Sequence, residues 1–272
     1  MLYLTEQVQN IKSYHFAHLL MEEKNHVLTI TLNRPEKKNA LNDIMTRELA
    51  FALSYARTNH QIWVVVIAAK GNIFCAGADL KAMLGEQQES ASTVPEANGE
   101  IVIGNVFNAL HKPCIAKVHA PVYAGGFLII CGCTHVISVD DAIFSLPEVK
   151  LGLYPFQVMQ SMLQIMPPRQ VLDACMRAKT FTAAEAEKAG LVSKVVSQEK
   201  LDAAVQALAD ELMQYSPSGI RLGLEAFENL KSVPAEEAHA YMKQMFGEAQ
   251  RTDDAKEGLL AFKEKRKPVW KG

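Results

Sequence analysis

Two short loops of small residues follow apolar stretches, and both can expose backbone N–H groups. The first is CAGAD, residues 75–79, and the second is YAGG, residues 123–126. A glycine inside an element costs roughly 0.5–1 kcal/mol relative to alanine, so the pair Gly125-Gly126 needs a physical reason. One reason is close packing of a helix against a strand, and the other is approach of the backbone to a ligand. Two N–H groups that converge on one oxygen stabilise charge developing on a carbonyl, so the two loops together predict an oxyanion hole.

Five stretches of the sequence, taken in order, point to a family. They are NRPEKKNALN (33–42), FCAGADLKAM (74–83), KPCIAKVHAPVYAGG (112–126), FSLPEVKLGL (144–153) and AFKEKRKPVW (261–270). In this combination the sequence resembles the crotonase (enoyl-CoA hydratase/isomerase) superfamily, from about residue 25 onward. The resemblance implies an α/β fold: a spiral of ββα units over residues 1–200 and a helical C-terminal region over 201–272. That region would make trimers or hexamers and contact coenzyme A.

The same resemblance implies the chemistry of the two loops. Substrates of the crotonase superfamily are acyl-CoA thioesters. The resemblance implies that the thioester carbonyl accepts hydrogen bonds from the N–H groups of Ala78 and Gly125. If Gly125 opens a helix, the helix dipole adds to this stabilisation. A thioester enolate held in this way needs no metal and no redox cofactor, and coenzyme A is part of the substrate. We interpret Asp79 as a helix N-cap or a loop hydrogen-bonding residue instead of a catalytic one.

The resemblance also implies where coenzyme A lies. The loop at 37–40 would meet the pantetheine and the phosphates, and residues 76 and 80 would lie near the adenine and the pantetheine. Residues 262 and 265 have the F-x-x-K spacing of the family and would contact the nucleotide, often from a neighbouring subunit. The residues expected to bind coenzyme A are therefore Lys37, Lys38, Ala40, Ala76, Leu80, Phe262 and Lys265.

One expected acid is missing. In two-acid hydratases of the family, a Glu stands two residues after the second glycine of the turn, and another stands twenty residues later. Here the first position is Leu128 and the second is Glu148. Leucine cannot bind or deprotonate water, so Glu148 remains as the general acid/base. Apolar neighbours such as Leu128, Phe127 and Phe156 would raise the pKa of Glu148 toward a useful range.

A single carboxylate favours an isomerase, in which one proton moves from C2 to C4 of a 3-enoyl-CoA and yields a 2-enoyl-CoA. Family isomerases of mitochondrial type also carry Leu and then Glu at these positions. Leu128, Tyr154 and Phe156 are expected to line the acyl pocket. Three alternatives stay open: a hydratase that uses Glu148 and an ordered water, a non-catalytic relative, and an RNA-binding relative that uses the basic residues of 263–271.

The elements that must position these residues can be predicted from periodicity. Residues 27–33, 62–69 and 114–120 are expected to form strands, as are short segments at 136–139 and 143–149. Helices are expected from near Asp43, over 100–111 and from Gly126, and helices dominate after about residue 155. Thr182 and Glu185 predict a capping box and Gly190 a helix end. The polar stretch 85–98 is expected to be a mobile surface loop.

The composition excludes several classes of function. The chain has 272 residues, 49% of them hydrophobic and 21% charged, with a formal net charge of −2. This charge gives no reason to expect nucleic acid or an anionic membrane as a partner. The N-terminal stretch does not read as a signal peptide, and no apolar run reaches the roughly 18 residues of a membrane span. Five scattered cysteines predict buried thiols in a reducing compartment, so we expect a cytoplasmic protein that binds no metal. The resemblance, and not the composition, implies that it forms a homotrimer or hexamer.

Overall fold

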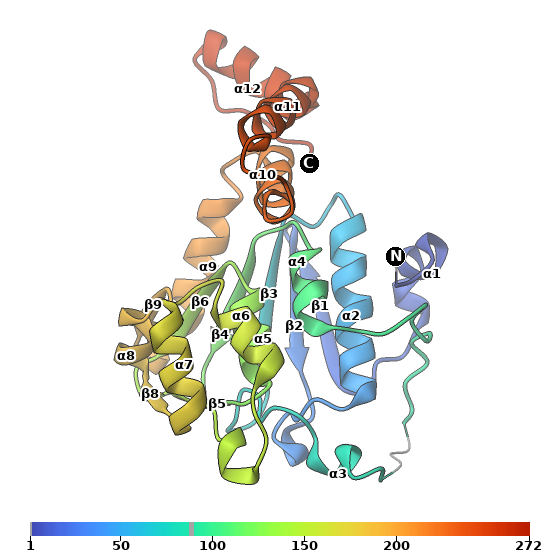
Figure 1. The fold of residues 1–272 in the computed structure, drawn as a ribbon. Helices are drawn as coiled ribbons and strands as arrows, with labels where there is room; N and C mark the ends of the chain where they lie inside the picture. Colours follow the sequence, from blue (N-terminus) through green and yellow to red (C-terminus); the bar gives the residue numbers. More distant parts are fainter. Residues whose placement is uncertain (1, 87–89) are drawn as a thin grey trace.

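The computed structural model describes residues 2–86 and 90–272, whose strands form two sheets (Figure 1). A six-stranded sheet has the order β1-β2-β3-β4-β6-β9; β1 and β2 are antiparallel and the other neighbours are parallel. In a three-stranded sheet, β7 lies between β5 and β8. The strands are β1 (Leu19–Lys24), β2 (Val27–Leu32), β3 (Val64–Ala69), β4 (Cys114–Val118), β5 (Val122–Tyr123), β6 (His135–Val139), β7 (Ile143–Ser145), β8 (Thr180–Thr182) and β9 (Lys194–Val196).

The burial of the central strands follows their sequences. Strand β3 lies between β2 and β4 and is buried from Val64 to Ala68, as its unbroken apolar run predicts for a strand covered on both faces. Strand β2 alternates instead, and its residues 28, 30 and 32 are completely buried. Each fully buried Leu or Ile side chain contributes about 1.5–3 kcal/mol relative to an exposed one, so these strands anchor the core.

The helices surround this sheet. They are α1 (Thr5–Gln9), α2 (Asp43–Thr58), α3 (Leu80–Met83), α4 (Ile103–Asn108), α5 (Gly126–Gly132), α6 (Phe156–Met162), α7 (Pro168–Arg177), α8 (Ala183–Lys188), α9 (Leu201–Leu212), α10 (Pro217–Leu230), α11 (Ala238–Arg251) and α12 (Asp253–Glu264). Helix α2 begins where predicted, because Asn42 Oδ1 accepts a hydrogen bond from the N–H of Met45 at 2.9 Å. The capping box of α8 is confirmed, since Thr182 and Glu185 bond reciprocally, and Gly190 adopts a positive φ of 84° just past that helix.

Some boundaries differ from the sequence-based expectation. The strand expected over 143–149 ends at Ser145, and Glu148 instead opens a 3-10 turn, Glu148–Leu151. Pro147 explains this end, because proline has no N–H to donate to a sheet ladder. The antiparallel edge strand β1 and the short strands β5, β8 and β9 were not expected. Two of these, β5 and β8, pair with β7 on its two sides. They therefore fix the position of β7, the strand that precedes Glu148.

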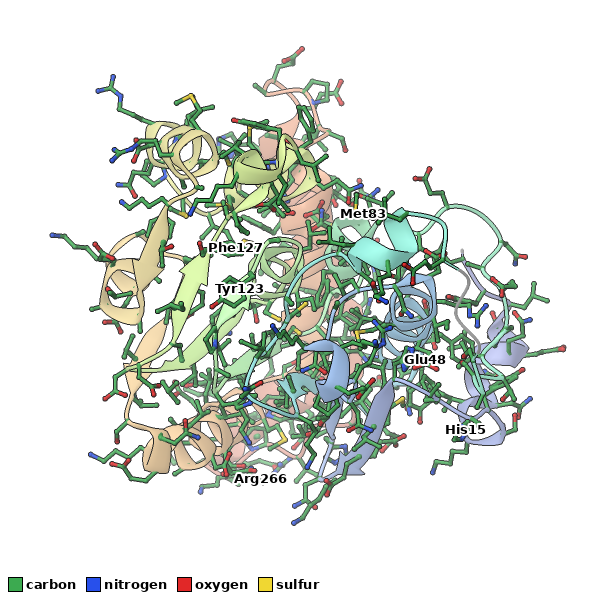
Figure 2. All side chains as sticks on the ribbon, turned by 90° about the horizontal axis from the view of Figure 1, so that it is seen from below. His15, Glu48, Met83, Tyr123, Phe127 and Arg266 are labelled. Atoms are coloured by element: carbon green, nitrogen blue, oxygen red, sulfur yellow. The ribbon has the colours of Figure 1, made fainter. Side chains whose placement is uncertain are left out.

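The N-terminal segment is fastened to α2 and to the chain that follows α3. The carboxylate of Glu48, completely buried on α2, accepts hydrogen bonds from the N–H groups of Ala17 at 2.6 Å and His18 at 2.8 Å (Figure 2). Of the loop expected to be mobile, 85–98, residues 87–89 lie outside the described residues. Farther along, His15 and Thr93 exchange hydrogen bonds of 2.8 and 3.0 Å. This part of the loop is therefore tied to the N-terminal segment.

The last third of the chain is helical, as expected. Helix α9 packs on β4 and β6, whereas α10, α11 and α12 contact one another and project beyond the sheet (Figure 1). Figure 1 places these three helices at the end of the molecule opposite to α3. The division of the chain at residue 200 stays a prediction. Within the described residues, no helix is long and apolar enough to cross a membrane.

Candidate active site

Backbone hydrogen bonds hold three loops side by side. The N–H of Tyr123 donates to the carbonyl of Cys75 at 2.9 Å, which joins the loop at 75–79 to the turn at 123–126. The N–H of Leu41 donates to the carbonyl of Gly77 at 2.7 Å, and the N–H of Asp79 returns a bond of 2.9 Å to Leu41. The two loops predicted to form an oxyanion hole are thus neighbours, and the loop at 37–41 flanks them.

Two N–H groups in these loops are left available. Among the described residues, the hydrogen bonds include no acceptor for the N–H of Ala78 or of Gly125. The two residues are close, because a Cβ added to Gly125 would lie 3.4 Å from the Ala78 nitrogen. Gly77 makes this approach possible: its φ is +89°, and a Cβ there would lie 2.8 Å from the Gly125 nitrogen. Gly125 immediately precedes α5, so the predicted helix start at Gly126 is confirmed.

Asp79 is held in a structural role. Its Oδ1 accepts a hydrogen bond from the N–H of Lys81 at 3.0 Å and caps α3, as the N-cap interpretation expected. Its Oδ2 forms an ion pair with Arg34 Nη1 at 2.7 Å, and both side chains are buried. Arg34 Nη1 also donates to the carbonyl of Ala40 at 3.1 Å. The pair therefore ties the loop at 37–41 to the loop that carries Ala78.

Asn39 is a second anchor that sequence reasoning missed. Its side chain is completely buried, with Oδ1 accepting from the N–H of Arg34 at 2.9 Å. Its Nδ2 donates to the carbonyls of Lys70 at 2.8 Å and Ile73 at 2.9 Å. These partners lie 31 and 34 residues away in the sequence, so no local pattern signals them. Asn39 itself has a left-handed φ of 53°, which asparagine tolerates better than most residues.

Glu148 follows the strand beside the glycine turn. Strands β5 and β7 are parallel with Tyr123 opposite Ser145, and the N–H of Ala124 donates to the carbonyl of Ser145 at 3.0 Å. Glu148 stands three residues after Ser145 and Gly125 two residues after Tyr123, so both leave the same end of this sheet. Burial raises the pKa of the Glu148 carboxyl, in the direction expected from the sequence. Its Oε2 is buried and has no hydrogen-bond partner among the described residues.

Two of the three residues expected in the acyl pocket line one cavity. Leu128 and Phe156 contribute to a cavity of about 650 Å³ that extends between α4, α5, α6 and α10. Leu128 is buried, whereas 70% of Phe156 is exposed. Tyr154 does not line this cavity, but its ring centroid lies 5.1 Å from that of Phe156. The position of the missing acid therefore holds a buried apolar side chain at the edge of this cavity, which Glu148, Ala78 and Gly125 do not line.

The residues expected to bind coenzyme A fall into two groups. The first group shares the loops around Ala78, where the N–H of Ala76 donates to the carbonyl of Lys38 at 3.0 Å. It contains Lys37, Lys38, Ala40, Ala76 and Leu80. Figure 2, seen from below, labels Met83 on α3, Tyr123 at the turn and the buried Phe127 at the start of α5. The second group, Phe262 and Lys265, belongs to the end of α12, which Figure 1 places at the opposite end of the molecule.

Comparison with known proteins identifies the family. The family model for enoyl-CoA hydratase/isomerase matches residues 22–272. The chain belongs to the enoyl-CoA hydratase/isomerase family. It is 32% identical over 252 residues to a probable mitochondrial enoyl-CoA hydratase of Dictyostelium discoideum, covering 92% of this chain and 89% of the relative. It is 34% identical to the carnitinyl-CoA dehydratase of Escherichia coli, covering 90% and 95% of the two chains.

Solved structures of the enoyl-CoA hydratase/isomerase family share the fold. The enoyl-CoA hydratase of Mycobacterium smegmatis aligns with a TM-score of 0.83 and 27% identity, over 93% of this chain and 98% of that one. The enoyl-CoA hydratase of Mycobacterium tuberculosis gives a TM-score of 0.83 at 26% identity, over 94% and 99%. The expected α/β crotonase-like fold with a helical C-terminal region is thus confirmed. The chain is an enzyme of the hydratase/isomerase type that processes acyl-CoA thioesters.

Proposed function

We propose that this enzyme shifts the double bond of a 3-enoyl-CoA to the 2-position, with Glu148 as the one carboxylate that moves the proton. The carboxylate removes a proton from C2, and the resulting dienolate carries its negative charge on the thioester oxygen. The carboxylic acid then returns the proton to C4, which leaves the double bond between C2 and C3. No atom is gained or lost, so one acid/base residue is sufficient.

The N–H groups of Ala78 and Gly125 are the proposed donors to the thioester oxygen. Their proximity and their lack of a protein acceptor among the described residues support this role. Donors that are already oriented stabilise an oxyanion without reorganisation, and removing one such donor typically costs about 2.7–4 kcal/mol in other enzymes. The start of α5 at the Gly125 donor adds the positive end of a helix dipole.

One observation carries the choice of an isomerase. The Glu148 carboxyl has a raised pKa and an unpartnered buried oxygen, while the other acid position of the family holds the buried Leu128. An unpartnered oxygen is free to accept a proton from carbon. A leucine at the second position gives a water molecule no acceptor there. Both features favour a proton shift within the substrate over addition of water.

A second candidate is hydration of a 2-enoyl-CoA or the reverse dehydration. The names of the relatives, enoyl-CoA hydratase and carnitinyl-CoA dehydratase, favour it. In that reaction Glu148 would have to orient a water, take its proton and deliver a proton to C2 without help from a second acid. The same oxyanion donors would serve, so the two candidates differ in what Glu148 deprotonates, C2 or a water, and in which carbon it then protonates, C4 or C2.

Coenzyme A is proposed to lie over the loops at 37–41 and 76–80. Lys37 and Lys38 supply cations for its phosphates, and the exposed side chain of Leu80 supplies an apolar surface for pantetheine or adenine. Phe262 and Lys265 would contact the nucleotide from a second copy of the chain, because their own site lies at the other end of the molecule. The proposed assembly is a homotrimer or a dimer of trimers.

A paired assay tests the reaction. Purified enzyme is given crotonyl-CoA and 3-hexenoyl-CoA, and hydration and double-bond migration are followed separately. We expect migration to dominate, and Glu148→Gln to lower its kcat by roughly 10²–10⁴-fold, the usual contribution of a general acid/base. Hydration that exceeds migration in the wild-type enzyme would support the second candidate instead.

The pH profile is a further readout of the same assay. Glu148 must be ionised to remove the C2 proton, and burial raises its pKa. The ionised fraction therefore decreases as pH falls through this raised pKa, so kcat/KM should decline at a higher pH than an ordinary carboxyl would give. Glu148→Gln should remove this limb of the profile. A limb that persists in the variant would belong to another group.

A further inference from the structure

The chain after α12 folds back along that helix. Lys265 ends α12 with a left-handed φ of 57°, and the N–H of Arg266 donates to the carbonyl of Ala261 at 3.0 Å. The following residues, 266–271, then pass beside α12 toward its beginning, as their contacts with residues 257 and 254 show. We call residues 266–271 the strap. Phe262 and Lys265 lie at the reversal between the helix and the strap, which we call the tip.

The first anchor of the strap is an arginine held by two carboxylates. Arg266 Nη1 and Nη2 bond to Glu257 Oε1 and Oε2 at 2.5 and 3.0 Å, and Arg266 Nε bonds to Glu264 Oε2 at 2.6 Å. Glu257 Oε1 also accepts the N–H of Val269 at 2.8 Å. Paired N–H donors on a carboxylate fix direction as well as distance. Glu257 therefore binds both the start and the middle of the strap.

The second anchor is the buried carboxylate of Asp254, of which 1% is exposed. Its Oδ1 accepts the N–H of Lys271 at 2.9 Å, and its Oδ2 accepts the Ser216 hydroxyl at 3.0 Å and the N–H of Ser218 at 3.1 Å. These bonds lower the pKa of Asp254 against the opposing effect of burial, which is the larger single influence. Asp254 thus joins the strap, α12 and the beginning of α10.

An aromatic contact lies between the two anchors. Trp270 Nε1 donates to the carbonyl of Gln214, after α9, at 2.8 Å. Its ring lies over Gly258 on α12, where an added Cβ would come within 3.3 Å of the ring. Gly272, which follows the strap, lies beside the partly buried Trp63, because a Cβ on Gly272 would lie 2.7 Å from Trp63 Nε1. The strap consequently connects α12 to the α9–α10 connection.

The side chains of the tip, Phe262 and Lys265, take no part in the hydrogen bonds that hold the strap. Phe262 is 86% exposed, and Lys265 is exposed at the reversal. Phe262 belongs to a group of exposed large apolar side chains on α11 and α12, with Phe246, Leu259 and Leu260, and a group of this kind is typical of an interaction surface. One residue in the left-handed conformation is sufficient to end a helix. The hydrogen bonds that hold the strap along α12 are therefore not needed to end that helix. The strap is thus suited to hold the tip in one direction.

We propose that Asp254 and Glu257, acting through the strap, are positioning residues for Phe262 and Lys265, and that they fix the tip so that it meets the nucleotide of an acyl-CoA bound by a second copy of the chain. This inference rests on the proposed function, because it takes Phe262 and Lys265 as contacts of coenzyme A bound by a second copy. Binding of the nucleotide then requires little further ordering of the tip, which lowers the entropic cost of binding. The strap acts on the nucleotide end of the substrate and leaves the proton transfer unchanged.

Glu257→Gln tests the proposal most directly. Glutamine can still accept the N–H of Val269 but lacks the charge and the second acceptor oxygen, so it cannot form the two-point ion pair with Arg266. The matched control is Glu248→Gln on α11, which removes an exposed ion pair of 2.8 Å with Arg251 outside the strap. Each variant is assayed with the 3-hexenoyl thioester of coenzyme A and with that of N-acetylcysteamine, which has no nucleotide.

We expect Glu257→Gln to raise KM for the coenzyme A thioester about five- to tenfold with kcat within about twofold of wild type. The kcat/KM for the N-acetylcysteamine thioester should stay unchanged, and Glu248→Gln should match wild type with both substrates. An unchanged KM for the coenzyme A thioester would overturn the proposal. An equal loss with both thioesters would also overturn it, because the strap would then only stabilise the fold or the assembly.

An exchange of the two charges separates loss of the ion pair from a general loss of folding. Glu257→Arg combined with Arg266→Glu restores an ion pair with the charges reversed, although not the bonds to Val269 and Glu264, and we expect it to reverse part of the rise in KM seen in Glu257→Arg alone. No recovery would count against the pair as an anchor. Failure of the proposed function is distinguishable, because it appears in the wild-type enzyme as absence of turnover with either thioester.

Discussion

At the scale of single residues, the proposed choice of reaction depends on Leu128 and Glu148. Leu128 lies one helical turn after the donor Gly125, and the family's other acid would stand there. Glu148 lies half-buried after β7, with a raised pKa and an unpartnered Oε2. The apolar side chain at position 128 leaves Glu148 as the one carboxylate of the family's two acid positions, and burial keeps the proton affinity of Glu148 high.

Restoring the second acid should therefore add hydration. In Leu128→Glu, a carboxylate at this position can bind and orient water together with Glu148. We expect the rate of crotonyl-CoA hydration to rise by about tenfold or more, while migration of the 3-hexenoyl double bond falls. Both rates are measured on the same preparation, with Leu128→Gln as the control of similar size that cannot act as a base. Equal hydration by the two variants would show that the second carboxylate is not what the enzyme lacks.

At the scale of elements, the site depends on how closely the loop at 75–79 approaches the turn at 123–126. Gly77 is the point of contact: a Cβ there would meet the Ala124 Cβ at 2.5 Å and the Gly125 nitrogen at 2.8 Å. A real Cβ cannot occupy that space, so the two donors would have to separate. The ion pair of Arg34 and Asp79 and the buried Asn39 hold the loops from the other side.

Gly77→Ala should thus harm activity more than stability. We expect kcat to fall by at least about a hundredfold, as when an oxyanion donor is displaced, and the free energy of unfolding to fall by about 1–3 kcal/mol. Gly85→Ala is the matched control, because Gly85 has a similar φ of +81° but nothing within 4 Å of an added Cβ. Assays and urea unfolding of both variants separate backbone strain from the contact. Similar losses of activity in the two variants would contradict this role of Gly77.

The family and the main helices and strands could be predicted from the sequence, because they depend on ordered motifs and local patterns, whereas the oxyanion chemistry of the two loops stays a prediction. Residues 27–33, for example, alternate as strand β2 does, and Gly125-Gly126 marks the start of α5. The anchors of the loops were not predictable. Arg34 and Asp79 are 45 residues apart and Asn39 bonds to residues more than 30 positions away, so only tertiary packing brings them together.

At the scale of the whole molecule, the proposed site is incomplete within one chain. The loops for coenzyme A and the tip of α12 lie at opposite ends (Figure 1). Helices α11 and α12 also expose large apolar side chains, including Phe246 at 64% and Leu259 at 73%. Exposed apolar groups of this size on neighbouring helices mark a surface that binds another protein. A second copy of the chain satisfies both observations at once.

This arrangement can be tested with two defective variants expressed together. One is Glu148→Gln, which keeps the tip, and the other combines Phe262→Ala with Lys265→Ala, which keeps the acid. In a closed ring of subunits, each site takes its acid from one chain and its tip from the next. With equal amounts of both chains, half of the acids and half of the tips are intact, so about one quarter of the sites should be complete. We therefore expect kcat/KM for 3-hexenoyl-CoA, at concentrations below KM, to approach a quarter of the wild-type value, while each variant alone is much less active. If acid and tip served the same chain, no complete site would form, and the mixture would show only the mean activity of the two variants.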